Sequence, residues 1–345
     1  MTASAAESDV SRPTIALVMG DPAGISPELA ARLLADDELR QSARIVVIGD
    51  QRILAAGAKV AGLVLDIDVV AADATPQPEA RPVLIDLAHL APAAVRIGEA
   101  TPEGGAFALA NFRRGLQMAQ AGTVDAVCFT PFNKQAMRYV YPGYDDEIRF
   151  VSDVIGFQGA AREFNVLEGL WNARVTSHIP LKDVAASLTS ERIVAEMELT
   201  DQCLRNAGFD RPRIAVAGLN PHAGDGGNFG REEIDVIAPA VKAGIERGLN
   251  VSGPYPADTV FVRAKKGAFD AVLTMYHDQG QIAMKLIGFE RGVTLMGGFP
   301  FPICTPAHGT AYDIVGRGIA DAGASRQAFL LAARMARKQR AARAG

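Results

Sequence analysis

Short apolar runs alternate with longer segments rich in alanine, leucine and arginine along most of the chain. Five of the runs are predicted to be buried strands, at residues 14–19 (TIALVM), 44–48 (RIVVI), 125–130 (DAVCFT), 213–217 (RIAVA) and 271–275 (AVLTM). The segments at 27–35, 107–119 and 190–207 have helical character. Strands that alternate with helices of about 10–15 residues are typical of a mostly parallel sheet. The pattern therefore predicts an α/β protein.

Glycine-rich and proline-rich segments follow several of the predicted strands directly. They cover residues 20–27, 130–134, 218–230 and 277–280. In open parallel sheets, ligands bind in the crevice at the carboxyl ends of the strands. We therefore expect these loops to form one large site, between two lobes of the chain.

Composition narrows the classes of function. With 345 residues, the chain is long enough for two lobes of roughly 100–200 residues each. The net charge of -4 gives no reason to expect a nucleic-acid partner, and we interpret the basic run at 334–343 as the exposed face of a C-terminal helix. No apolar stretch approaches the length of a membrane span. The small, polar residues 1–11 are expected to be disordered.

The three cysteines, Cys128, Cys203 and Cys304, lie far apart in the sequence and show no metal-type spacing. An odd number of scattered cysteines favours a reducing compartment. We expect a cytoplasmic protein.

Three of the five histidines lie in loops with unusual backbone requirements. They are His178 in VTSHIP, His222 in GLNPHAGDGG and His277 in MYHDQG. Neutral imidazole is the commonest protein ligand for divalent transition metals, and three imidazoles leave open positions for a substrate. The spacings of 44 and 55 residues, however, match no local zinc motif. The alternative is that each histidine is a hydrogen-bonded loop residue.

The segment PAHGTAYDIVGRGIADA at residues 306–322 has a different character. Its exposed backbone at His308, Gly309 and Thr310 is suited to an adenosine, and the Asp313 carboxylate is suited to ribose hydroxyls. The first loop, GDPAGISPE, carries Asp21 and Gly24 but lacks the GxGxxG pattern.

Other catalytic arrangements have less support. An acid–base pair of His277 and Asp278 is disfavoured, because adjacent residues rarely face each other. No local motif supports a nucleophilic cysteine or a Ser-His-Asp triad.

Seven motifs occur in order along residues 13–330 and together resemble one family. They are GDPAGISPE (20–28), TPFNK (130–134), HIPL (178–181), GLNPHAGDGGNFGREE (218–233), GPYPADT (253–259), YHDQGQIAMK (276–285) and HGTAYDIVGRGIA (308–320). The chain looks like the 4-hydroxythreonine-4-phosphate dehydrogenase family of vitamin B6 synthesis. That family also contains phospho-threonate/erythronate dehydrogenases and dihydrodiol dehydrogenases of the terephthalate type.

The resemblance implies a two-lobed α/β fold, similar to isocitrate and isopropylmalate dehydrogenases, with a central cleft. The expected nucleotide-binding lobe is discontinuous: it comprises residues 12–130 and about 286–345, and it binds NAD or NADP. The expected metal, substrate and dimerisation lobe covers about 131–285. The resemblance implies a divalent ion (Zn, Mg, Mn or Co) held by His178, His222 and His277, with ligands from both subunits of a homodimer. The implied cofactor-binding residues are Asp21, Gly24, His308, Gly309, Thr310 and Asp313.

The implied chemistry is oxidation of a secondary alcohol. The metal acts as a Lewis acid on the hydroxyl, and hydride leaves to the nicotinamide. A β-keto acid product would then be able to lose carbon dioxide. Candidates for proton handling or substrate orientation are Lys285, Asp258, Asp278 and Lys134, and the sequence does not choose among them.

The sequence departs from the family pattern where a substrate phosphate is expected. The family's Gly-His-Thr-Glu segment is GYDDE here, at residues 143–147, so that Tyr144 and Asp145 replace His-Thr. The family's phosphate-contacting Lys, Asn and Arg fall on Lys285, Thr294 and Ile303. A phosphate needs charge-assisted donors, and Asp145 would repel it.

We therefore expect an unphosphorylated hydroxy acid or diol-carboxylate as substrate, bound through Tyr144, Asp145, Lys285 and Thr294. Trp171, Phe132 and Tyr144 are candidates to line a flatter pocket. The alternative is a 4-hydroxythreonine-4-phosphate dehydrogenase, or a phospho-threonate/erythronate dehydrogenase. In that case Arg291, Arg149 or Arg138 replaces the lost phosphate ligands. Two further classes are an acyl or phosphoryl transferase that binds no NAD, and a binding paralogue with an inactive site, against which the three histidines argue.

Overall fold

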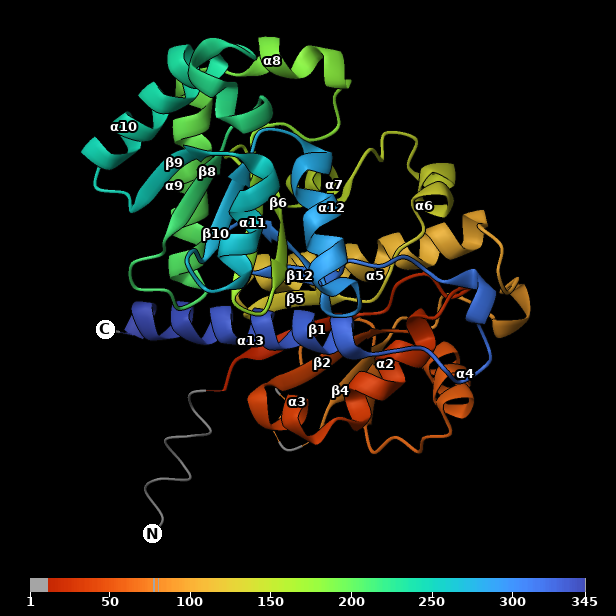
Figure 1. Cartoon of the computed structure of the whole chain (residues 1–345). Coiled ribbons are helices and arrows are strands. Elements are labelled where there is room, and N and C mark those ends of the chain that lie inside the picture. Colours follow the sequence, from red (N-terminus) through yellow and green to blue (C-terminus); the bar gives the residue numbers. More distant parts are fainter. Residues whose placement is uncertain (1–11, 77, 80, 345) are drawn as a thin grey trace. The chain divides into compact units, whose positions relative to one another are not determined.

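The structure is a computed structural model that describes residues 12–76, 78–79 and 81–344 (Figure 1). Residues 1–11, which are expected to be disordered, lie outside the described residues. The chain forms two compact units. The first contains the chain up to Ala161 and again from Val293 onward, and the second runs from Arg162 to Gly292. Each unit has its own run of strands covered by helices, and the predicted α/β class is confirmed.

The first unit is built on seven strands in the spatial order β3-β4-β2-β1-β5-β12-β11. All neighbouring pairs are parallel except the antiparallel pair β11 and β12. The strands are β1 (Thr14–Val18), β2 (Arg44–Gly49), β3 (Asp68–Ala71), β4 (Val83–Asp86), β5 (Ala126–Phe129), β11 (Val293–Gly297) and β12 (Ile303–Pro306). The helices are α2 (Ser26–Ala35), α3 (Asp37–Ser42), α4 (Gln51–Ala61), α5 (Pro102–Gln120), α6 (Lys134–Val140), α7 (Glu147–Ile155) and α13 (Gly323–Ala344), with short turns at Pro92–Ala94 and Tyr312–Ile314.

Residues 131–161 belong to the first unit, whereas the expected lobe boundary lies at residue 130. Aromatic packing explains this placement. The rings of Phe129 and Phe132 stack at 4.3 Å between centroids, and Phe150 of α7 lies 5.6 Å from Phe112 of α5. Because these side chains are buried in one core, the segment after β5 stays with the unit that contains β5. The chain re-enters this unit at Val293, near the expected position of about 286.

The C-terminal helix α13 carries the basic run. Its apolar side is buried through residues such as Ala328, Phe329 and Ala332. Arg337 donates to the carbonyl oxygen of Ser42, and Arg340 pairs with Asp125 at 2.9 Å. No helix in the described part of the chain combines the length and apolar character that a bilayer crossing requires.

The second unit is built on five strands in the order β6-β7-β10-β8-β9. Here β6 and β7 are antiparallel, and the other neighbours are parallel. The strands are β6 (Arg162–Leu167), β7 (Leu170–Arg174), β8 (Ile214–Ala217), β9 (Val251–Tyr255) and β10 (Ala271–Thr274). The helical segments are α8 (Val184–Ser187), α9 (Ser190–Asn206), α10 (Ala238–Glu246), α11 (Ala257–Lys265) and α12 (His277–Gly288), with shorter ones at Leu181–Asp183, Pro221–Gly227, Glu233–Ile237 and Phe289–Arg291.

Helix α12 lies very close to strand β7 at one position. A Cβ atom on Gly280 would lie 2.1 Å from Oδ1 of Asn172, which is completely buried. The Asn172 amide is held in place, because its Nδ2 lies within hydrogen-bond distance of the carbonyl oxygens of Ala173 and Val272 and of the Thr274 hydroxyl. Glycine at position 280 therefore sets how closely α12 packs on the sheet.

We predict that Gly280→Ala destabilises the protein although alanine favours helices. Overpacking against a fixed neighbour typically lowers the free energy of unfolding by about 1–3 kcal/mol, and a contact as close as this one belongs at the upper end, above the roughly 1 kcal/mol that alanine gains over glycine in a helix. Urea unfolding followed by circular dichroism measures the difference. Leu286→Ala is the matched control, because Leu286 is 84% exposed on the same helix and its loss should change stability little. Equal stability of Gly280→Ala and wild type would contradict the close approach.

Candidate active site

The three histidines predicted as metal ligands follow three neighbouring strands of the second unit. Strands β7, β10 and β8 are adjacent and parallel. His178 lies shortly after β7, His277 begins α12 after β10, and His222 lies in the segment Pro221–Gly227 after β8. This is the arrangement in which loops at the carboxyl edge of a sheet share a site.

The structure brings two of these three side chains together within one chain. The rings of His178 and His277 lie 5.8 Å apart between centroids, with their planes inclined at 45°. The ring of His222 instead lies 6.1 Å from that of Phe229. Among residues 12–76, 78–79 and 81–344, no three His, Cys, Asp or Glu side chains lie close enough to hold a metal ion.

The His277 imidazole is oriented by its neighbour in sequence. Its Nδ1 lies 2.7 Å from Oδ1 of Asp278. The expectation that adjacent residues do not face each other is therefore wrong at this position. Both residues lie in the first turn of α12, where no preceding helical turn restricts the directions of their side chains. A carboxylate on one ring nitrogen fixes the ring and leaves the other nitrogen, Nε2, for a ligand.

Gln279 joins the loop of His277 to the loop of His222. Its Oε1 accepts from the backbone nitrogen of Met275 at 2.7 Å, and its Nε2 donates to the carbonyl oxygen of Gly218 at 2.8 Å. Sequence reasoning missed this role. The glutamine in the HDQG motif is the signal that was available, because a polar residue just inside a helix start often satisfies loop backbone groups.

The loop that carries His222 adopts a backbone conformation that most residues avoid. His222, Ala223 and Asp225 have φ angles of 54°, 53° and 44°. Such left-handed residues cost about 1–3 kcal/mol each and persist only where the surroundings enforce them. Glu233, which is 3% exposed, holds the start of this loop: one of its oxygens accepts from the backbone nitrogens of both Leu219 and Asn220 at 2.7 Å. Glu233 was also missed from the sequence.

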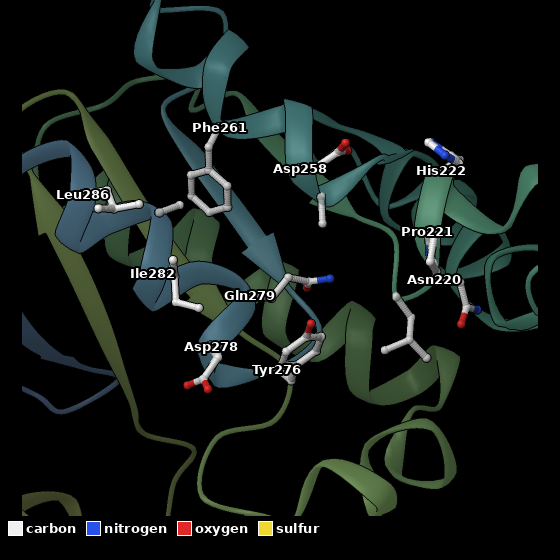
Figure 2. Close-up of a pocket in the computed structure, with 13 residues that line it drawn as sticks. Asn220, Pro221, His222, Asp258, Phe261, Tyr276, Asp278, Gln279, Ile282 and Leu286 are labelled. Carbon is white, nitrogen blue, oxygen red and sulfur yellow. The ribbon is translucent and has the colours of Figure 1, made fainter.

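A cavity of about 620 Å³ lies beside this loop in the second unit. Figure 2 shows His222 on one side and Asp278 and Ile282 on the other, with Tyr276 and Gln279 between them. The cavity has the size of a small-molecule site. Its lining combines polar groups with an apolar wall: Leu219, Asn220, Pro221, His222, Ala257, Asp258, Phe261, Tyr276, Asp278, Gln279, Ile282, Ala283 and Leu286.

Two predicted proton-handling residues, Asp258 and Asp278, line this cavity. The other two do not. Lys285 is exposed on α12, with Nζ 6.0 Å from the ring centroid of Phe289, and Lys134 of the first unit pairs with Glu147 at 3.1 Å.

The predicted cofactor residues gather in the first unit, where three loops meet. The backbone nitrogen of Asp21 donates to the carbonyl oxygen of Pro131 at 2.9 Å, and that of Ile25 donates to the carbonyl oxygen of Thr310 at 3.0 Å. A Cβ on Gly24 would lie 2.7 Å from the same carbonyl oxygen. Glycine is thus required where the first loop meets the 308–313 segment.

Asp21 forms the buried centre of these loops. Its side chain accepts from the backbone nitrogen of Ala23 at 3.0 Å and from the hydroxyl of Tyr312 at 2.5 Å. Burial raises the pKa of Asp21 above its ordinary value, and the hydrogen bond from Tyr312 partly opposes this rise. Burial likewise raises the pKa of Tyr312, with the Asp21 carboxylate adding to the effect.

The segment after β12 carries the groups predicted to contact an adenosine. His308 Nδ1 lies 3.0 Å from the carbonyl oxygen of Gly309, while its Nε2 is buried without a hydrogen-bond partner in the described structure. Asp313 is exposed. An apolar pocket of about 280 Å³ lies along the first loop, with Gly24, Ile25, Val315 and Gly316 in its lining.

The predicted substrate residues of the first unit lie in unexpected places. Tyr144 is 1% exposed and packs against Phe150 in the core, so it offers no surface to a substrate. Asp145 is exposed and pairs with Arg149. Thr294 is half-buried on β11. Ile303, at the position where the resemblance leads us to expect an arginine, is completely buried in the core of the unit.

The expectation that Trp171 and Phe132 line a flat pocket is not met either. Trp171 is 1% exposed and packs edge-on against Phe164 in the second unit, and Phe132 belongs to the aromatic core described above. Large aromatic side chains in these positions stabilise the two cores instead.

The sequence model of the family described as "Pyridoxal phosphate biosynthetic protein PdxA" matches residues 41–332 of this chain. The chain belongs to the PdxA family. The curated relatives are named as dehydrogenases, and the predicted dehydrogenase class is confirmed. The family resemblance inferred from the seven motifs is confirmed as well.

A relative from Rhizobium meliloti (strain 1021), named "Putative 4-hydroxythreonine-4-phosphate dehydrogenase 2", is 67% identical, over 96% of this chain and 95% of its own. The crystal structure of a 4-hydroxythreonine-4-phosphate dehydrogenase from Klebsiella pneumoniae is 36% identical, with a TM-score of 0.81 over 94% of this chain and 98% of that one. That of a terephthalate 1,2-cis-dihydrodiol dehydrogenase from Burkholderia xenovorans LB400 is 29% identical, with a TM-score of 0.64 over 92% and 98%. This chain therefore shares both sequence and fold with PdxA proteins over most of its length.

We predict that Asp21→Asn changes how stability depends on pH. The native state holds the Asp21 proton more tightly than the unfolded chain, whose pKa is 3.8, so its contribution to stability falls as pH rises from 3.8 through the raised native pKa. Asparagine does not titrate. The stability of Asp21→Asn relative to wild type should therefore increase across that window and then level off.

Urea unfolding of both proteins, at a series of pH values between about 4 and 7, measures this difference. Asp73→Asn, at an exposed carboxylate of the same unit, is the matched control. A stability difference for Asp21→Asn that stays constant with pH would contradict the buried, proton-holding carboxylate.

Proposed function

We propose that this PdxA protein is a metal-assisted, NAD-dependent dehydrogenase that oxidises a secondary alcohol of a phosphorylated hydroxy acid, of the 4-hydroxythreonine-4-phosphate type. The observation that carries the proposal is the pair of imidazoles, His178 and His277, at the ends of neighbouring parallel strands in a chain of a dehydrogenase family. The names of the relatives favour this phosphorylated substrate, the alternative of the sequence analysis, over the unphosphorylated one expected first.

The residues of the second unit fit a divalent ion. Two imidazoles within 5.8 Å of each other are a suitable donor pair for a transition metal, and Asp278 holds the ring of His277 as an outer carboxylate. His222 would supply the third imidazole. Because it lies away from the pair in its own chain, we propose that it serves the site of the partner in a homodimer.

The residues of the first unit fit a nicotinamide dinucleotide. The orphaned Nε2 of His308, the exposed backbone of Gly309 and the exposed carboxylate of Asp313 offer the polar groups that an adenosine requires. The apolar pocket along the first loop offers a place for a flat base. NAD is preferred to NADP because a carboxylate at position 313 accepts from ribose hydroxyls and would repel a 2′-phosphate.

When bound, the metal lowers the pKa of the substrate hydroxyl, and the nicotinamide accepts the hydride. The side chains have to orient the alcohol and take its proton. Of the four candidates, Lys134 is paired with Glu147, Asp278 with His277, and Lys285 lies outside the cavity of the second unit. Asp258 lines that cavity together with His222, and no described side chain pairs with its carboxylate. We therefore propose that Asp258 accepts the proton of the substrate hydroxyl.

Two guanidinium groups are available to replace the missing phosphate ligands. Arg138 donates to the carbonyl oxygen of Tyr144 at 3.0 Å, and Arg149 pairs with Asp145, so both lie at the segment that is Gly-His-Thr-Glu in the family. Arginine recognises phosphate through paired N–H donors. Lys285 is the one family phosphate contact that this chain retains, and we propose that it binds the phosphate.

A second candidate is the unphosphorylated hydroxy acid or diol-carboxylate, with decarboxylation of the oxidised product. The specific observation in its favour is charge balance around residue 145. Lys134 pairs with Glu147 and Arg149 with Asp145, so that two nearby cations are already neutralised. Asp146 offsets the remaining charge of Arg138 in this stretch of sequence. The buried Ile303 adds no donor. Such a neutral cluster attracts a dianion weakly.

We predict that the metal site needs histidines from two protomers. His222→Ala and His277→Ala should each abolish turnover and weaken Mn²⁺ binding while leaving circular dichroism unchanged, because each removes one ligand. When the two variants are refolded together, random pairing makes about half of the dimers mixed, and each mixed dimer has one intact site of two. Activity should therefore recover to about a quarter of wild type.

No recovery in verified mixed dimers would contradict a shared site. His89→Ala is the matched control, because His89 stacks on Phe107 in the first unit and should not affect metal binding. Full activity of wild type after exhaustive chelation would contradict the proposal that turnover needs a metal ion.

We predict that Lys285→Met raises the KM for 4-hydroxythreonine-4-phosphate about 10–100-fold, with a smaller change in kcat, because a charge-assisted contact to the phosphate is lost. NADH production is the readout, with 4-hydroxythreonine and a cyclic diol-carboxylate as further substrates. Lys266→Met, at an exposed lysine of the same unit, is the control. Wild-type preference for an unphosphorylated compound would select the second candidate, and absence of NADH with every substrate would count against both.

A further inference from the structure

Three loops of the first unit converge on the hydroxyl of Tyr312, a residue that the sequence analysis did not single out. The hydroxyl accepts from Nδ2 of Asn133 at 2.7 Å and donates to Oδ2 of Asp21 at 2.5 Å. Asp21 follows β1, Asn133 follows β5 and Tyr312 follows β12. One phenol thus links the ends of three parallel strands.

Both partners of this hydroxyl are held in a fixed orientation. Oδ1 of Asn133 accepts from the backbone nitrogen of Ala136 at the start of α6, so its Nδ2 must face Tyr312. Oδ1 of Asp21 accepts from the backbone nitrogen of Ala23, so the other oxygen of Asp21, Oδ2, faces Tyr312. Since an amide nitrogen can only donate, the Tyr312 oxygen accepts from Asn133 and its own proton is directed to Oδ2 of Asp21.

Tyr312 lies between a strained residue and an exposed carboxylate. Ala311 has a φ of 46°, in the left-handed region that alanine avoids, and Asp313 follows Tyr312 directly. On either side the segment is held by other contacts. Thr310 bonds to Ile25 through the backbone, and Ile314 and Val315 pack against Ile25, Leu29 and Ala320. Ala311 also packs on this cluster, and the hydroxyl of Tyr312 is the contact that ties the segment to the loops after β1 and β5.

We infer that Tyr312 is a positioning residue for the dinucleotide: its hydroxyl, held between Asp21 and Asn133, fixes the direction in which residues 308–313 present their backbone groups and the Asp313 carboxylate. This inference rests on the proposed function of the first unit. Pre-organisation of this kind improves affinity because the segment need not be ordered when the ligand binds.

The test is Tyr312→Phe, which keeps the ring and removes only the hydroxyl. NADH binding, followed by nicotinamide fluorescence, should weaken about tenfold, and the KM for NAD should rise by a similar factor, with kcat within about twofold of wild type. Hydrogen exchange of the backbone amides at 308–316 should speed up in the enzyme without cofactor, while the melting temperature changes little. Exchange and binding are independent of turnover.

Two matched variants distinguish positioning from packing. Tyr139→Phe removes an exposed hydroxyl whose only described partner is Gln135, and it should leave NADH binding and exchange at 308–316 unchanged. Asp21→Asn keeps a polar group opposite Tyr312, because the amide can donate to the phenol oxygen. Its NADH affinity should lie closer to wild type than that of Tyr312→Phe.

The outcomes separate this inference from the proposed function. If wild-type protein does not bind NADH at all, the proposed function fails. If wild type binds NADH and Tyr312→Phe binds it equally well, with the same exchange at 308–316, the inference is overturned while the function stands. A uniform rise in exchange across the whole first unit would assign Tyr312 to general stability and would also overturn it.

Discussion

Loops at the carboxyl ends of parallel strands cannot satisfy their own backbone groups, and this constraint governs both units of the chain. These backbone groups are instead paired with polar side chains, some from the same loop and some from elsewhere in the sequence. Glu233 accepts from two backbone nitrogens of the loop that leads to His222, Gln279 bridges the ends of β8 and β10, and Asp21 accepts from its own loop. Each contact fixes a loop whose shape an isolated peptide would not adopt.

Both units contain loops that are fixed by side-chain hydrogen bonds, but the loops present different groups. In the second unit the fixed loops present imidazoles and carboxylates around a cavity, which suits an alcohol and a cation. In the first unit they present backbone groups and glycines that allow close approach, which suits a dinucleotide.

Much of the fold was predictable because apolar runs of strand length and longer amphipathic segments are local signals. The predicted strands at 14–19, 44–48, 125–130, 213–217 and 271–275 correspond to β1, β2, β5, β8 and β10. The helices at 27–35, 107–119 and 190–207 correspond to α2, α5 and α9. The positions of the site histidines after strands followed from the same reasoning.

What the sequence could not show are contacts between distant residues. Tyr312 lies 291 positions from Asp21, and Gln279 lies 61 from Gly218, so neither pairing leaves a local pattern. Tyr144 illustrates the opposite error. Its place in a motif suggested a ligand contact, but the neighbouring aromatic residues Tyr141 and Phe150 draw it into a core. Residue type and position identified candidates, and packing decided which of them face a ligand.

The burial of Ile303 also bears on how this chain can evolve. Its side chain lies in the core with Val127, Phe299 and Phe301, on a strand that pairs with β5. An arginine introduced there would place a charge among apolar groups unless several neighbours changed first. New substrate recognition is more accessible at the surface arginines near residue 145, where single substitutions leave the core intact.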